Sequence, residues 1–152
     1  MRALTSVFRI ASCVMLVLAT SAISSAATTQ KSLYERLGGK TAITAVIDEF
    51  VARVGADKRI NRFFAAAVAD PARMARLKTN LVTLVCQASG GPCKYTGKDM
   101  KTAHKGMAIT NADFDALVQD LVGALNKFKV PAKEKSDLLA LLGPMRPQIV
   151  GQ

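Results

Sequence analysis

The chain has 152 residues, of which 50% are hydrophobic, and it carries a formal net charge of +10. This length excludes a large multidomain protein and allows one domain with a short appendage. A basic chain could bind nucleic acid or an anionic surface, but here the lysines and arginines are scattered singly along predicted helices. We therefore expect no nucleic-acid partner.

The N-terminus has the layout of a secretory signal peptide. Residues 1–9 include two arginines, residues 10–20 are apolar, and residues 21–27 are mostly small, with cleavage points after Ala22, Ala26 or Ala27. We predict a cleaved signal over residues 1–26, a mature domain over residues 27–152, and export, in a bacterium to the periplasm.

The apolar run is too short for a membrane anchor, since a bilayer core takes about 20 residues, so we expect no stable membrane span after cleavage. Ile10–Cys13 resembles a lipoprotein box. It lies very early in the chain, however, and the apolar run continues past it, so a lipid anchor on Cys13 is disfavoured.

Export would place the remaining cysteines in an oxidising compartment. Cys13 would leave with the signal, and Cys86 and Cys93 would remain as an even pair, which makes them a candidate disulfide. The alternative is a zinc ion held by these two cysteines and His104. That arrangement lacks closely spaced ligand pairs and a clear fourth ligand.

Helical periodicity runs through the rest of the chain. Ser32–Leu37 predicts a short turn that ends at Gly38–Gly39, and Thr41 can cap a helix that ends near Gly55. An aromatic pair, Phe63–Phe64, follows in a tight connection. The apolar positions of the Thr41 helix recur at spacings of three and four residues: Ile43, Val46, Ile47, Phe50, Val51 and Val54.

The second half of the chain predicts further helices. Asp70–Pro71 is a helix start signal, and Gly90–Gly91–Pro92 marks the end of that helix. Thr110 and Asp113 resemble a capping box ahead of the longest apolar stripe, and Pro131 opens the last helix. No segment alternates with a period of two, so we predict an all-α fold with about four substantial helices.

His104 is the only histidine in the chain. At helical spacing it shares a face with Met100 and Met107, while Lys98, Lys101 and Lys105 fall on another face. A neutral imidazole in an apolar cleft suits the axial position of a haem iron. Taken alone, the pattern is more typical of a core histidine whose ring nitrogens are hydrogen-bonded.

A set of motifs resembles the group 1 truncated haemoglobins and covers roughly Ser32 to Val150. In order these are Leu33–Tyr34–Glu35–Arg36–Leu37–Gly38–Gly39, Phe63–Phe64, Gly90–Gly91–Pro92, Tyr95–Thr96–Gly97, Met100 and Ala103–His104–Lys105–Gly106. The resemblance implies a two-over-two helical sandwich around haem b. Because no C-x-x-C-H sequence occurs, we expect the haem to be held non-covalently.

The resemblance also implies roles for individual residues. His104 would ligate the iron on the proximal side, and Phe64 would stack on the haem face. Arg76 and Tyr95 would meet the haem carboxylates, because a planar guanidinium can hold both oxygens. The other expected contacts are Phe50, Val51, Leu77, Leu81 and Val85, with Met100, Ile109 and Phe114 at the proximal side or haem edge.

One departure from the family concerns the distal side. Val51 stands where the family usually has a tyrosine, and Leu81 where it often has a glutamine. Asn80 and Thr79 lie off the apolar stripe, so the sequence predicts a pocket without a hydrogen-bond donor. Losing such a bond, about 1.5–3 kcal/mol, would speed oxygen release by roughly ten-fold to a hundred-fold.

We therefore expect a haem b protein that reversibly binds oxygen, nitric oxide or carbon monoxide, for gas binding, transport or sensing in the cell envelope. An enzyme on the same haem, a nitric-oxide dioxygenase or weak peroxidase, is the alternative. It is disfavoured because the chain shows no flavin domain and no distal acid–base group. A non-haem exported helical binding protein is a third hypothesis. We expect an electron donor of unknown identity and a monomer or weak homo-oligomer.

Overall fold

The computed structural model describes residues 30–152, so the predictions for the signal peptide and Cys13 lie outside the described residues. Within the described range all regular structure is helical, which confirms the all-α prediction. Four helices are long: α2 (Gly39–Ala56), α4 (Pro71–Ala88), α6 (Asn111–Lys127) and α7 (Ala132–Leu142). The short ones are α1 (Leu33–Arg36), α3 (Ala65–Val68), α5 (Met100–His104) and α8 (Arg146–Ile149), with 3₁₀ turns at Asn61–Phe64 and Gly143–Met145.

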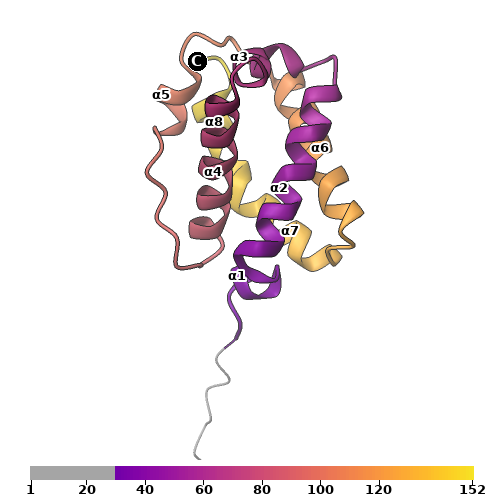
Figure 1. Cartoon of the computed structure of the whole chain (residues 1–152). Coiled ribbons are helices and arrows are strands. Elements are labelled where there is room, and N and C mark those ends of the chain that lie inside the picture. The colour runs from indigo at the N-terminus through magenta and orange to yellow at the C-terminus, as the bar shows by residue number, and fades with distance from the viewer. Residues whose placement is uncertain (1–29) are drawn as a thin grey trace, which may run out of the picture.

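Helix α2 lies at the centre of the fold, where it packs against both α4 and α6 (Figure 1). The main core forms where the apolar stripes of these helices meet, because each stripe must leave water. Its buried residues include Ile47, Phe50 and Val54 of α2, Val82 and Val85 of α4, Leu121 and Leu125 of α6, and Leu138 of α7.

A second, smaller core holds α5 and α8 together. Its buried members are Ile109, Phe114 and Ile149, and Met100 and Met107 pack against them. Burying each of these large side chains contributes about 1.5–3 kcal/mol. This cluster anchors the five-residue α5 to the rest of the molecule.

The helix starts predicted at Asp70 and Thr110 are confirmed. The start predicted at Thr41 is wrong: α2 begins two residues earlier, at Gly39, and its N-cap is Gly38, whose left-handed backbone a glycine adopts without strain. The Asp70 carboxylate accepts hydrogen bonds from the backbone N–H groups of Ala72 (2.8 Å) and Arg73 (3.3 Å) at the start of α4. At the start of α6, the Thr110 hydroxyl accepts from the Asp113 N–H, and the Asp113 carboxylate accepts from the Thr110 N–H. Both caps satisfy N–H groups that have no partner within their own helix.

The two glycine pairs meet at Tyr34. Gly38 and Gly39 both have positive φ, 90° and 73°, and the Tyr34 hydroxyl accepts a hydrogen bond from the backbone N–H of Lys40. Gly91 approaches the same ring so closely that a Cβ there would lie 2.5 Å from it. The two glycine pairs therefore form tight turns, and they also allow Tyr34 of α1 to pack closely against the end of α4.

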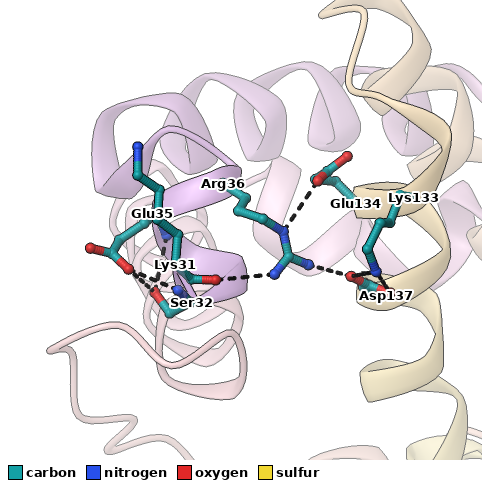
Figure 2. Close-up of polar contacts among 7 residues, drawn as sticks. All are labelled: Lys31, Ser32, Glu35, Arg36, Lys133, Glu134 and Asp137. Atoms are coloured by element: carbon teal, nitrogen blue, oxygen red, sulfur yellow. Dashed lines mark hydrogen bonds and ion pairs between the residues drawn. The ribbon is translucent and has the colours of Figure 1, made fainter. Parts of the chain in front are cut away.

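Arg36 joins the first helix to α7 (Figure 2). Its Nε donates to Glu134 at 3.2 Å, and its terminal nitrogens reach Asp137 and the Lys31 carbonyl. The Arg36 side chain is only 22% exposed and Glu134 13%, so water screens this charge network less than an exposed pair. The network closes the fold by linking its N-terminal and C-terminal parts.

Candidate functional site

His104 is the last residue of α5 and is half-buried. Its Nδ1 lies 2.7 Å from the carbonyl oxygen of Met100, one turn earlier. A carbonyl oxygen only accepts, so Nδ1 carries the hydrogen, and in the neutral form of the ring the lone pair lies on Nε2. This is the arrangement that orients a histidine for a metal ion, because the Nδ1 bond fixes both the tautomer and the ring.

Two cavities adjoin His104. The first has a volume of about 380 Å³ and the second about 310 Å³, and the lining of each is mostly apolar. They are adjacent, because they share lining residues from the four helices α4, α5, α6 and α8: Leu81, Leu84, Met100, His104, Phe114, Leu117 and Ile149. A large apolar space with one free imidazole nitrogen is a default candidate for a binding site.

Most of the residues predicted for the site line these cavities. Phe64, Leu77, Tyr95 and Ile109 line the first, and Phe50 and Val85 line the second. Leu81, Met100, Phe114 and His104 line both. The structure thus brings together residues that lie as far apart in the chain as Phe50 and Phe114.

Two predicted residues do not line either cavity. Val51 is half-buried against the main core, one position round α2 from Phe50, and Arg76 lies on the exposed face of α4. Successive residues of a helix point about 100° apart. Val51 therefore does not share the face of Phe50, and Arg76 does not share the face of Leu77. Arg73, four residues before Leu77, lines the first cavity instead, with its side chain 66% exposed at the rim.

Several lining residues were missed by the sequence analysis, among them Asn80 on α4 and Phe63 beside the predicted Phe64. The prediction that Asn80 faces away from the pocket is wrong: it is half-buried and lines the first cavity. Its spacing of three residues from Leu77 and four from Leu84 was the signal that places it on their face. Thr79 is exposed, as predicted.

The polar groups around the first cavity are mostly committed to the protein. The Tyr95 hydroxyl donates to the Lys98 carbonyl at 2.7 Å, and burial, with a smaller effect from Asp99, raises the pKa of Tyr95, which keeps the phenol neutral. Hydrogen bonds from Thr110 chiefly hold the pKa of Asp113 below its ordinary value. These two groups therefore position the walls rather than titrate near neutral pH.

Cys86 and Cys93 form a disulfide with 5.7 Å between their Cα atoms. The bond joins the last turn of α4, whose residues line the cavities, to the loop that leads to α5 and His104. Because both sulfurs are used, neither cysteine offers a thiolate to a metal ion.

The residues of the site fit a haem group. A haem is a broad apolar macrocycle with two carboxylates and an iron that takes an axial imidazole. The apolar cavities, the free Nε2 of His104 and the guanidinium of Arg73 at the rim match these three features. Fold and site together define a globin-like haem pocket.

The comparisons with known proteins agree with this geometry. The family model described as "Bacterial-like globin" matches residues 32–150. The chain is 36% identical over 118 residues to the group 1 truncated hemoglobin GlbN of Mycolicibacterium paratuberculosis, covering 78% of this chain and 83% of that protein. It is 31% identical to the group 1 truncated hemoglobin of Tetrahymena pyriformis, covering 80% of this chain and 97% of that one.

Solved structures give the same result. The Fe(III) form of the Tetrahymena pyriformis truncated hemoglobin has a TM-score of 0.73 at 30% identity, covering 80% of this chain and all of that one. The 2/2 hemoglobin of Synechococcus, solved in the cyanomet state with covalently attached heme, has a TM-score of 0.72 at 30% identity and the same coverage. The chain belongs to the bacterial-like globin family, among the group 1 truncated haemoglobins.

Proposed function

We propose that this protein is exported to the cell envelope and binds diatomic gases at a non-covalently held haem b, with His104 as the proximal ligand. The haem, when bound, supplies an iron with a coordination position open to a small gas. The observation that carries the proposal is His104 itself: its Nδ1 donates to the Met100 carbonyl at 2.7 Å, and the ring lines both apolar cavities.

The other residues of the site have roles that follow from their positions. Phe64, Leu77 and Leu81 supply apolar walls that exclude water from the space beside His104. Arg73 is the cationic side chain at the rim of the first cavity and suits a carboxylate of the haem. Tyr95 holds the loop before α5 through its bond to Lys98, which steadies the segment that carries His104.

Two observations support non-covalent attachment and export. The sulfurs of Cys86 and Cys93 bond each other, so neither is free to form a thioether to the haem. A structural disulfide is also typical of proteins that mature outside the cytoplasm. Within residues 30–152, no helix is long and apolar enough to cross a membrane.

Absorption spectra of the purified protein and of His104→Ala test the haem site. We expect the wild-type protein to show a haem band that shifts when carbon monoxide is added to the reduced protein, because His104 would hold the haem in an apolar cavity with room for a small gas. His104→Ala should lose most of its haem or show an altered band. Acid–organic extraction should release the haem. A wild-type protein that takes up no haem would contradict the proposal.

Export has its own test, the mass of the protein recovered from the periplasmic fraction of a bacterial host. We expect a chain that begins just after Ala26 or Ala27. A full-length chain confined to the cytoplasm would contradict export. A mass that includes a lipid attached to Cys13 would show that the protein is anchored to a membrane instead.

A further inference from the structure

The first cavity contains a hydrogen-bond donor that no other described residue uses. Asn80 of α4 is half-buried and lines this cavity together with His104 of α5. Its backbone carbonyl accepts a bond from the Thr83 hydroxyl at 3.1 Å. Its side-chain amide, which has two N–H donors, has no hydrogen-bond partner among residues 30–152.

The other polar side chains that line the first cavity are paired within the protein, lie at its rim, or cannot donate. Tyr95 donates its hydroxyl proton to a backbone carbonyl, and His104 does the same from Nδ1. Arg73 pairs with the Asp70 carboxylate and is largely exposed at the rim. Asp113 is a carboxylate and can only accept. The terminal nitrogens of Arg73 are left for an anionic group at this exposed rim, so Asn80 is the half-buried side chain that offers uncommitted N–H donors within this cavity.

The surroundings of Asn80 make such a donor effective. It shares a helical face with Leu77 and Leu84, three residues before it and four after it, and both line the same cavity. Few water molecules can compete for an amide among leucine side chains, and a hydrogen bond is electrostatically stronger in a medium of low dielectric constant. An amide left without any partner there would cost free energy.

We propose that the Asn80 amide donates a hydrogen bond to the gas molecule held in this cavity and slows the release of oxygen. The inference rests on the haem site proposed above. Oxygen held at a ferrous haem carries more negative charge than carbon monoxide does, so the donor favours oxygen. Asn80 would thus supply the donor that neither Val51 nor Leu81 offers.

The test compares the wild-type protein with Asn80→Leu, Asn80→Asp and Thr79→Val. Leucine removes the donor and fits the apolar face, and aspartate keeps the shape but replaces the donor with an anion. Thr79→Val is the matched control, because Thr79 is the exposed neighbour of Asn80 and lines neither cavity. Laser photolysis gives the oxygen and carbon monoxide dissociation rates, and infrared spectroscopy gives the C–O stretching frequency.

We expect Asn80→Leu to release oxygen about ten-fold to a hundred-fold faster than the wild-type protein. Carbon monoxide release should change by much less, and the C–O stretch should move to higher frequency because a donor near the ligand is lost. Asn80→Asp should show the same changes to a larger extent, since its charge repels the ligand. Thr79→Val should match the wild-type protein in all three measurements.

Three results would overturn the inference. If Asn80→Leu keeps wild-type oxygen release and the wild-type C–O stretch, the amide does not contact the gas. If the variant instead loses haem faster with gas release unchanged, Asn80 contacts the haem carboxylates. A wild-type protein without a carbon monoxide-shifted haem band would overturn the haem site as well, which separates the failure of the proposed function from the failure of this inference alone.

Discussion

The contacts of Tyr34 show how a single residue fixes the packing of α1 against the end of α4. Its ring lies between Gly39 and Gly91, and its backbone N–H donates to the Ser89 carbonyl at 2.8 Å. Gly91 itself donates to the Cys86 carbonyl at 2.8 Å, so the chain turns tightly against the aromatic ring. Gly91 is needed for this close approach, because a Cβ there would lie 2.5 Å from the ring. A Cβ at Gly39 would lie 3.7 Å from the ring, which is ordinary contact, and glycine is favoured there by its positive φ of 73°.

We predict that Gly91→Ala destabilises the protein by about 1–3 kcal/mol, the usual cost of overpacking. The added Cβ would lie 2.5 Å from the Tyr34 ring and 2.8 Å from the Cys86 carbonyl oxygen, and the backbone atom cannot move away cheaply. Urea unfolding measures the loss. Gly55→Ala is the control: nothing lies within 4 Å of its Cβ, so it should be neutral or stabilise by about 0.4–1 kcal/mol. Equal effects of the two substitutions would contradict the packing argument.

At the scale of an element, α5 is the helix on which the function depends most. Five residues are too few for a stable isolated helix, so its order comes from its cap and from tertiary contacts. The Asp99 carboxylate accepts from the Thr102 N–H at 2.9 Å, and α8 packs against the helix. The position of His104 therefore depends on groups outside α5.

We predict that Asp99→Ala frays α5, whereas Asp99→Asn preserves it, because an amide oxygen can accept the same capping bond. Amide hydrogen exchange of Thr102 measures the cap directly, since that N–H loses its partner in the alanine variant. We expect a large loss of protection in Asp99→Ala and little in Asp99→Asn. Unchanged protection of Thr102 in Asp99→Ala would show that tertiary contacts alone hold the helix.

The same cap is sensitive to acid. The hydrogen bonds from Thr102 lower the pKa of Asp99 from its ordinary value of 3.8. A carboxyl with a lowered pKa in the folded state contributes its full stabilisation above its ordinary pKa and loses it as the pH falls through the lower, folded value. Protection of Thr102 in the wild-type protein should therefore decline only below about pH 4, and Asp99→Asn should lack this particular decline.

At the scale of the whole molecule, the disulfide ties the two walls of the site together. Cys86 is fully buried near the end of α4, and Cys93 lies in the segment between α4 and α5. Figure 1 shows this segment as a long loop that leads from α4 to α5. Without the bond, that loop would be held mainly by Tyr95, whose N–H donates to the Gln87 side chain and whose hydroxyl donates to Lys98. The covalent link thus connects the helix that carries Leu77 and Leu81 to the segment that carries His104.

We predict that replacing both cysteines, Cys86→Ala with Cys93→Ala, lowers the free energy of unfolding by about 2–3 kcal/mol, the loop-entropy value for a bridge this short. Urea unfolding under oxidising conditions gives the difference. The wild-type protein treated with a reductant should approach the stability of the double variant, and the variant should not respond to the reductant. Coinciding unfolding curves of the oxidised proteins would show that the bridge does not stabilise the fold.

How far the site could be predicted varied with the kind of residue. His104 and Phe64 lie in motifs that can be recognised in the sequence, and both residues line the cavities in the structure. Arg76 and Asn80 both lie on α4, but Arg76 is exposed whereas Asn80 lines the first cavity. Neighbouring positions of a helix point in different directions, so a small error in the predicted rotation of α4 exchanges an exposed residue for one that faces the cavity. The sequence predicts which residues form the apolar stripe of α4. The rotation of α4 against its neighbours decides which residues beside that stripe also face the cavity.

The all-helical class, the helix starts at Asp70 and Thr110 and the likeness to truncated haemoglobins all follow from local patterns in the chain. Capping, glycine turns and apolar periodicity act over a few residues, so they can be recognised in a linear sequence. The pairing of α5 with α8, the shape of the two cavities and the inward position of Asn80 depend on contacts between segments distant in the chain. Those contacts arise only when the helices pack, because burial of one helix face is decided by the faces that oppose it.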